Sequence, residues 1–167
     1  MALPQVTTHQ DRLLTVNVKE TIALPLMDGV SLTPLFLDRD NGVWVLFGRF
    51  EPGVVLPTHF HTGNVHFFTT KGTWSYVEYP NDPQTEGSYL FEPAGSVHTL
   101  MVPKDAKEPA EGIFIVNGAN VNFVNGEYQD VTDAGSIEHA ILEAVKAGLV
   151  PMPKYITAKS GARFSTE

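Results

Sequence analysis

The feature that most constrains the fold is a succession of short β-strand patterns, each closed by a turn signal. Segments rich in β-branched and aromatic residues recur at 30–37, 43–50, 54–61, 65–70, 73–79, 88–91, 97–102 and 112–116. Turn-forming triplets such as Asp40-Asn41-Gly42 and Pro93-Ala94-Gly95 separate them. Many short strands at regular spacing predict an all-β sandwich or barrel.

One helix is expected, late in the chain. The apolar residues that follow helical spacing are Ile137, Ala140, Ile141, Ala144 and Val145. Ser136 is predicted to cap this helix, which should end before Gly148. We expect a single domain made of an N-terminal arm (1–29), a barrel core (30–133) and a C-terminal helix and tail (134–167). The tail is expected to be either a loosely attached arm or a subunit contact.

Composition excludes several classes of function. The 167 residues include no Cys, which rules out thiolate zinc sites, thiol redox motifs and Cys nucleophiles. The net charge of -8 argues against nucleic acid or an anionic membrane as a partner. No apolar run is long enough to cross a bilayer, and no export signal is visible, so we expect a cytoplasmic protein. Without thiolates, a transition metal would have to be bound by imidazole side chains.

Four of the six histidines lie between positions 59 and 98. Because strand residues two apart share a face, His59 and His61 should present their imidazoles side by side, with Phe60 facing the other way. Two neutral imidazoles at that spacing can chelate a first-row transition metal. The alternative is a pair of surface or packing histidines. His66 and His98 are further candidates.

Two motifs, in order, resemble those of the cupin family over about residues 30–120. The first runs from Gly53 through five residues to His59-x-His61 and closes at Gly72. The second runs from Gly87 through Pro93-x-Gly95 to His98. The resemblance implies a cupin-type double-stranded β-helix, a jelly-roll barrel with a metal in its mouth. It also implies that His59, His61 and His98 are the metal ligands.

The sequence departs from the cupin pattern at one position. Cupins usually carry a Glu separated by six residues from the glycine that matches Gly72, and here that position is Val65, followed by His66. His66 would be a ligand only if the strand were bulged or slipped by one residue. Otherwise it is a partly buried or supporting histidine. A site with three imidazoles and no carboxylate would favour anionic, chelating ligands.

Within the cupins, the chain resembles the group that contains acetylacetone dioxygenase and 2,4'-dihydroxyacetophenone dioxygenase. The segments that carry this resemblance are 57–63, Gly72-Thr73-Trp74 with Tyr76 and Glu78, and 91–99. It implies a non-haem Fe(II) enzyme that uses O2 to split a carbon–carbon bond next to a carbonyl, in a small α-hydroxyketone or β-diketone. Zn, Ni or another divalent metal is also compatible with imidazole ligands.

Four residues near the motifs are candidates for the pocket. Trp74 and Tyr76 would wall an apolar substrate pocket if their strand faces the barrel interior. On that strand Glu78 would be a fourth ligand or a catalytic base, unless it faces solvent. Glu92 could orient a ligand imidazole by accepting its free N–H, or could be a surface carboxylate. We expect Glu78 or Glu92 to orient or deprotonate the substrate.

Two other functions remain open on the sequence. One is a zinc-binding sensory or regulatory cupin, and the other is a metal-dependent isomerase or decarboxylase on the same fold. Exposed sheet edges of small jelly rolls are often covered by another subunit, so we expect a homodimer or a dimer of dimers.

Overall fold

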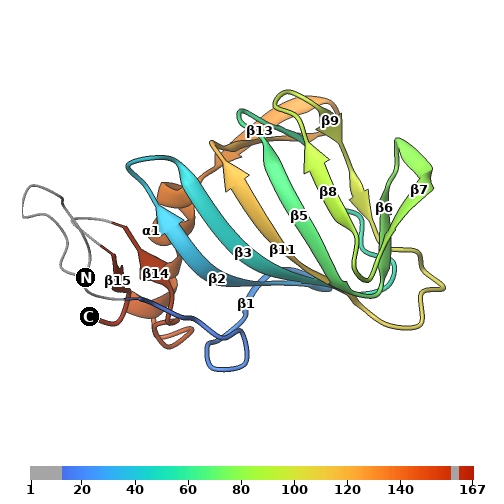
Figure 1. The fold of residues 1–167 in the computed structure, drawn as a ribbon. Coiled ribbons are helices and arrows are strands. Elements are labelled where there is room, and N and C mark those ends of the chain that lie inside the picture. The colour runs from blue at the N-terminus through green and yellow to red at the C-terminus, as the bar shows by residue number, and fades with distance from the viewer. Residues whose placement is uncertain (1–12, 159–161) are drawn as a thin grey trace, which may run out of the picture.

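The computed structural model describes residues 13–158 and 162–167 (Figure 1). The largest sheet has the order β15 (Arg163–Phe164), β14 (Ile156–Thr157), β2 (Val30–Asp38), β3 (Val43–Phe50), β11 (Ala110–Asn117), β5 (Val65–Lys71) and β8 (Tyr89–Glu92), with β1 (Leu24–Met27) also paired to β2. A second sheet has the order β13 (Glu127–Thr132), β12 (Asn120–Val124), β4 (Thr58–His61) and β9 (Val97–His98). The third is β10 (Leu100–Met101), β6 (Thr73–Tyr76) and β7 (Tyr79–Thr85), and α1 spans Ala134–Lys146.

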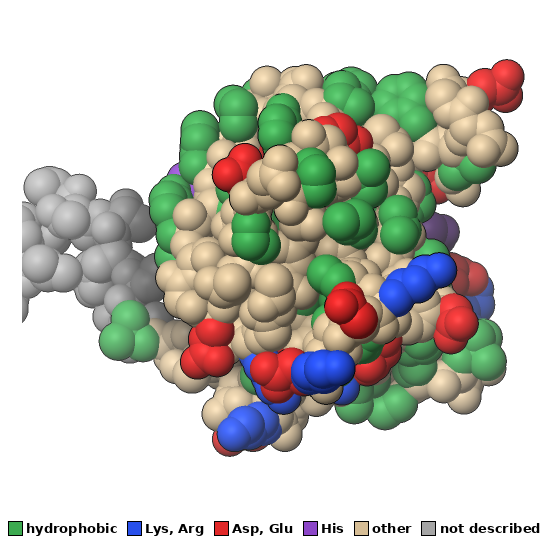
Figure 2. Space-filling model, turned by 90° about the vertical axis from the view of Figure 1, so that its right-hand side faces the viewer, with side chains coloured by type: hydrophobic (Ala, Val, Ile, Leu, Met, Phe, Trp, Pro, Cys, Tyr) green, Lys and Arg blue, Asp and Glu red, His purple; other side chains and the backbone are tan. Residues whose placement is uncertain are grey.

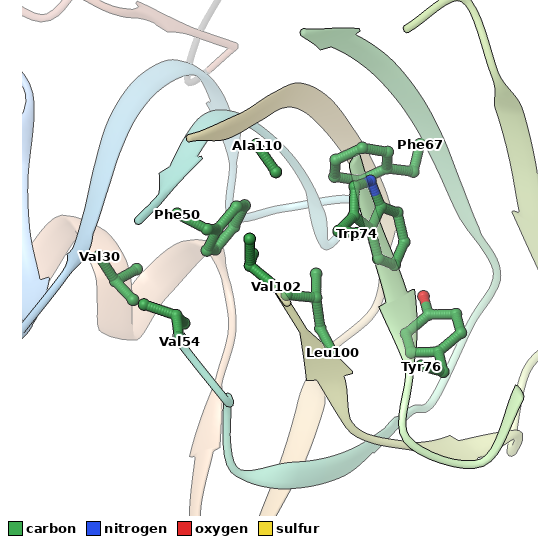
Figure 3. Packing of buried hydrophobic residues seen from close by; sticks show 9 residues of the cluster. All are labelled: Val30, Phe50, Val54, Phe67, Trp74, Tyr76, Leu100, Val102 and Ala110. Atoms are coloured by element: carbon green, nitrogen blue, oxygen red, sulfur yellow. The ribbon is translucent and has the colours of Figure 1, made fainter. Parts of the chain in front are cut away.

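The inner faces of these sheets form the core. Burial alternates strictly along β3, as the period of two in its sequence predicts. Phe50, Phe67 and Trp74 come from different strands and pack together with smaller aliphatic side chains (Figure 3). The prediction of an all-β jelly roll with one short helix is confirmed. The sheets are packed face to face and do not close into one barrel.

The helix begins earlier than the sequence predicted. Asp133, not Ser136, is the N-cap, and its side chain accepts a hydrogen bond from the Ser136 backbone N–H. The Ser136 hydroxyl donates a hydrogen bond to the Asp133 carbonyl oxygen and accepts one from the Asp133 backbone N–H. The prediction of Ser136 as the N-cap was wrong, because the two residues form a capping box in which Asp133 is the N-cap and Ser136 is the third residue of the helix. The helix ends before Gly148, as expected.

The tail belongs to the fold of its own chain. β14 pairs in parallel with β2 and thereby covers the edge of the large sheet, and β15 pairs with β14. Tyr155, just before β14, is 1% exposed and packs in a cluster with Leu37 and Trp44. Of the two alternatives expected for the tail, the loosely attached arm is wrong, because buried aromatic packing holds this segment. The subunit contact stays a prediction.

Two strands that matter for the site were not predicted. β12 and β13 form a hairpin around Asn125 and Gly126, which both have positive φ. Asn-Gly between two strands is a strong hairpin signal, but the neighbouring segments are rich in polar residues and give little hydrophobic alternation. The predicted strand 97–102 is also divided at Thr99, so that β9 and β10 belong to different sheets. In the described part of the chain, no helix has the length and hydrophobicity needed to cross a bilayer.

Candidate metal centre

Three histidines from two neighbouring strands lie together. The side chains of His59 and His61 on β4 both point inward, whereas Phe60 between them packs near Phe123. β9 pairs with β4 and places His98 directly opposite His59. The ring centroids of the three imidazoles are 4.7 to 5.3 Å apart. Pairing of two short strands thus assembles the cluster from two distant sequence motifs.

The imidazoles are placed to bind one ion. Each offers a ligand atom, and these atoms lie within 4.8 Å of one another. His59 Nδ1 lies 2.9 Å from the carbonyl oxygen of Pro57, which leaves Nε2 as the nitrogen that can bind a metal. Burial is the main cause that lowers the pKa of His59, to about 4. The hydrogen bond with the Pro57 carbonyl oxygen opposes this shift, and the neighbouring imidazoles add to it. At pH 7 this imidazole is therefore neutral, the form that binds metal.

A buried carboxylate enters the same cluster from another sheet. Glu92, at the end of β8, is 4% exposed, and its Oε2 lies 2.9 Å from His61 Nε2 and 3.3 Å from His98 Nε2. Its Oε1 accepts a hydrogen bond from the Tyr76 hydroxyl. Burial alone would raise the pKa of Glu92, but the contacts with His61 and His98 outweigh it and hold that pKa well below its usual range. Burial and the charge of Glu92 raise the pKa of Tyr76, which stays a donor.

The polar atoms of this cluster are not satisfied by protein alone. Among the described residues, the buried side-chain atoms without a hydrogen-bond partner are His61 Nδ1, Glu92 Oε2, His98 Nε2 and Asn120 Oδ1. Three belong to the cluster, and Asn120 lies opposite His61 in the β12–β4 ladder. Unpartnered buried polar atoms cost free energy unless a ligand or water satisfies them. Imidazole and carboxylate donors suit Fe, Zn or Ni, so the residues present fit a divalent metal.

Glu78 lies beside the cluster and contacts it indirectly. Its two carboxylate oxygens accept hydrogen bonds from the backbone N–H and the hydroxyl of Thr99, at 2.9 and 2.8 Å. Burial would raise the pKa of Glu78, but bonds from its own backbone and from Thr99 lower it. The Thr99 hydroxyl is also 2.8 Å from that of Thr58, the residue before His59. Glu78 thus holds the two segments that carry His98 and His59.

Of the two aromatic residues expected to wall a pocket, one lies at the cluster and one lies in the core. The Tyr76 ring is 4.6 Å from the His98 ring. Trp74 has no exposed surface, packs against Phe67, and donates from its indole N–H to the Thr69 hydroxyl at 3.0 Å (Figure 3). Only Tyr76 therefore contacts the imidazoles.

His66 lies apart from the cluster. Val65 points inward with no exposed surface, so alternation along β5 turns His66 to the opposite face. There its Nδ1 lies 2.7 Å from the Tyr89 hydroxyl oxygen. No bulge at this point of β5 brings His66 to the imidazoles, and β5 contributes no carboxylate to them.

Asn120 is the residue at this site that the sequence did not reveal. It became a candidate only through the pairing of β12 with β4, and β12 itself was not predicted. The Asn125-Gly126 turn signal could have located the hairpin, and with it Asn120, but not the strand that it pairs with.

The packed sheets and the inward-facing cluster of three histidines define a cupin. A family model described as the ChrR Cupin-like domain matches residues 11–121, and the chain belongs to this family. No curated protein sequence matches the chain.

Solved structures extend the comparison. A protein of unknown function with a cupin-like fold from Ralstonia eutropha is 42% identical, with a TM-score of 0.82 over 91% of this chain and 96% of that one. An acetylacetone dioxygenase from Acinetobacter johnsonii is 16% identical, with a TM-score of 0.68 over 86% of this chain and 99% of that one. A putative acetylacetone dioxygenase from Methylibium petroleiphilum is 17% identical, with a TM-score of 0.70 over 81% and 98%. At these last two identities the likeness concerns the fold.

Proposed function

We propose that the protein is a non-haem Fe(II) dioxygenase that cleaves a carbon–carbon bond next to a carbonyl in a small α-hydroxyketone or β-diketone. The observation that carries the proposal is the buried cluster of His59, His61 and His98, in which His61 Nδ1 and His98 Nε2 have no hydrogen-bond partner. Three protein ligands with open positions are typical of catalytic metal sites. The fold shared with an acetylacetone dioxygenase supports this choice of reaction.

In this proposal the chain's own residues hold and shape the site. Bound Fe(II) would supply the one-electron chemistry that lets O2 react with an electron-rich carbon. His59, His61 and His98 would hold the ion. Glu92 stays ionised beside them, oriented by the hydrogen bond from Tyr76, and is the carboxylate that can orient or deprotonate a substrate.

The remaining candidates have supporting roles. Glu78 acts through Thr99, so we assign it to positioning His98 and not to direct proton transfer. Tyr76 lines the site, and Trp74 packs against Tyr76, with the two ring centroids 5.1 Å apart. Together these aromatic side chains would limit access of water to the imidazoles.

We propose a small carbonyl compound and O2 as the partners, and a cytoplasmic location. The net charge of -8 supports the exclusion of nucleic acid. On the face shown in Figure 2, the Lys and Arg side chains lie among acidic ones and form no basic patch. Ion pairs of opposite charge include Arg49 with Glu111 and Lys71 with Glu108.

The second candidate is a zinc-binding sensory or regulatory domain, which the match to the ChrR cupin-like family favours. It predicts one equivalent of bound zinc and no O2 uptake with any ketone. A metal-dependent isomerase or decarboxylase would instead turn over its substrate under strict anaerobiosis. An oxygen electrode and an anaerobic assay with the same panel of ketones separate the three functions.

The central test is His61→Ala. This change removes one of three imidazoles, so we expect the loss of bound iron and a fall in O2 uptake of more than about 100-fold. Iron is measured by elemental analysis, and uptake with a panel of α-hydroxyketones and β-diketones. His139→Ala, an exposed helix position, is the matched control and should retain both. A fully active His61→Ala variant would falsify the proposal.

A further inference from the structure

We propose that Asn120 is a positioning residue for His61: its carboxamide oxygen accepts a hydrogen bond from the Nδ1–H group of the imidazole and so keeps Nε2 free for the metal. The inference rests on the metal site of the proposed function, but not on the reaction assigned to it. The observation behind it is a pair of unpartnered atoms. His61 Nδ1 and Asn120 Oδ1 are both buried, and neither has a hydrogen-bond partner among the residues that the structure describes.

The register of β4 and β12 brings these two side chains together. Asn120 lies directly opposite His61, and residues directly opposite on paired strands share a face of the sheet. At the next position of the ladder, the Thr62 backbone N–H donates to the Ala119 carbonyl oxygen at 2.8 Å. Hydrogen-bonded and non-hydrogen-bonded pairs alternate in an antiparallel ladder, so His61 and Asn120 form a non-hydrogen-bonded pair, in which the side chains lie closer. The carboxamide is therefore within reach of the imidazole.

The two atoms have complementary chemistry when a metal is bound. His61 Nε2 lies 2.9 Å from Glu92 Oε2, which is 3.3 Å from His98 Nε2, so the Nε2 edges of both rings face the centre of the cluster. Nδ1 of His61 is then on the edge turned away from the metal, and in a neutral imidazole bound through Nε2 it carries the proton. A buried N–H without an acceptor costs free energy, and Asn120 Oδ1 is an acceptor that has no other donor.

The other imidazole of β4 provides an internal comparison. His59 Nδ1 already has a partner, the Pro57 carbonyl oxygen at 2.9 Å. Asn122, which lies opposite His59, donates instead to Asp130 Oδ1 at 2.6 Å and to the Thr132 hydroxyl at 3.0 Å. On β12, the asparagine opposite the satisfied imidazole thus bonds to β13, whereas the asparagine opposite the unsatisfied imidazole keeps a free carboxamide oxygen.

A small rotation of the Asn120 side chain would close the hydrogen bond. Within the described chain the two atoms are not yet hydrogen-bonded to each other. The terminal torsion angle of asparagine is broadly distributed, so turning the carboxamide toward Nδ1 costs little. An acceptor on the nitrogen that does not bind the metal fixes both the tautomer and the orientation of a ligand histidine. Asn120 would therefore prepare His61 to bind the ion through Nε2.

The experiment uses Zn(II) as the probe, because this d10 ion permits NMR of the bound histidines. Metal-free wild type, Asn120→Ala, Asn120→Asp and Asn122→Ala are titrated with Zn(II), and long-range 1H–15N spectra then report the tautomer of each imidazole and the exchange of its N–H with water. Asn120→Ala should lose about 10–100-fold in Zn(II) affinity, and its His61 Nδ1–H should exchange rapidly.

The other two variants and one proton serve as controls. Asn120→Asp keeps an acceptor oxygen, so it should restore slow exchange and bind Zn(II) at least as tightly as wild type. Asn122→Ala makes the same truncation on the same strand, at a side chain that bonds to β13, and should match wild type. The Nδ1–H of His59, which the Pro57 carbonyl oxygen accepts, should exchange slowly in all four proteins.

A slowly exchanging His61 Nδ1–H in Asn120→Ala would overturn the inference, and so would a wild type in which His61 binds Zn(II) through Nδ1. If Asn120→Ala fails to fold, as judged by circular dichroism, the Zn(II)-loaded wild type decides. A nuclear Overhauser contact between the His61 Nδ1–H proton and the Asn120 side chain supports the hydrogen bond, and its absence excludes it. Wild type that binds no Zn(II) would overturn the metal site itself, and the inference with it. An absence of O2 uptake by the Fe(II)-loaded protein would affect only the proposed reaction.

Discussion

At the scale of single residues, glycines of the two histidine motifs serve different purposes. Gly72 has φ +72°, and a Cβ built there would lie 2.4 Å from the Pro109 carbonyl oxygen and 2.9 Å from Ala110 Cα. Gly87 has φ +88° with no atom within 4 Å of such a Cβ. Gly72 is therefore required for both its backbone conformation and the close approach of a neighbouring chain segment, and Gly87 for conformation alone.

We predict that Gly72→Ala lowers the free energy of unfolding far more than Gly87→Ala. The left-handed conformation costs an alanine about 1 kcal/mol at either position. At Gly72 the methyl group also overlaps backbone atoms that cannot move aside, which should add about 2 kcal/mol or more. Urea denaturation of both variants measures the difference. Equal losses would show that the contact with Pro109 is unimportant.

At the scale of elements, the site depends on which strands pair. β4 pairs with β9 on one side and with β12 on the other. His59 and His61 of β4 therefore lie between a strand that carries His98 and a strand that carries Asn120. β8 approaches from the large sheet with Glu92. The tail strands have a different task, because β14 covers the edge of β2 far from the histidines (Figure 1). An edge covered in this way is unavailable for pairing with another chain.

We predict that Tyr155→Ala lowers the free energy of unfolding by about 3–5 kcal/mol, the range for truncating a buried aromatic side chain. Tyr155 is 1% exposed, and its buried side chain anchors the tail. Its backbone N–H also donates a hydrogen bond to the Ser165 hydroxyl oxygen at 3.0 Å. Tyr128→Ala, at an exposed aromatic on β13, should change stability by less than about 0.5 kcal/mol. Chemical denaturation compares them. A Tyr155→Ala loss as small as the control would mean that the tail is not anchored there.

At the scale of the whole molecule, the outer face of β5 and β8 exposes aromatic side chains. Phe68, Tyr89 and Phe91 are 44 to 54% exposed, and cross-strand pairing joins Phe68 to Tyr89 and His66 to Phe91. Contiguous exposed apolar surface of this kind is typical of interfaces. Since the tail covers an edge of its own chain, this face is the better candidate for the subunit contact of the proposed homodimer.

We predict that wild type is a dimer or a dimer of dimers and that Phe91→Lys dissociates it, because a buried unpaired ammonium would oppose association. Light scattering after size exclusion gives the mass. Leu149→Lys, an exposed position after the helix, should keep the wild-type mass. A monomeric wild type would contradict self-association, and a Phe91→Lys variant of unchanged mass would exclude this face.

The sequence by itself determined the strand-rich fold, the family resemblance and the three histidines. These follow from local rules: alternation places His59 and His61 on one face, and turn residues mark the ends of strands. The helix cap and the β12–β13 hairpin also had local signals, in Asp133-x-x-Ser136 and Asn125-Gly126, that the hydrophobic pattern concealed.

Only the tertiary structure decided which carboxylate meets the imidazoles. From the sequence, Glu78 and Glu92 were equivalent candidates, because neither a period of two nor a motif spacing reports the pairing of distant strands. The β5–β8 register buries Glu92 against His61 and His98, whereas Glu78 is bound to Thr99. Side-chain direction is a local property, but the meeting of side chains from separate sheets depends on the packing of the whole molecule.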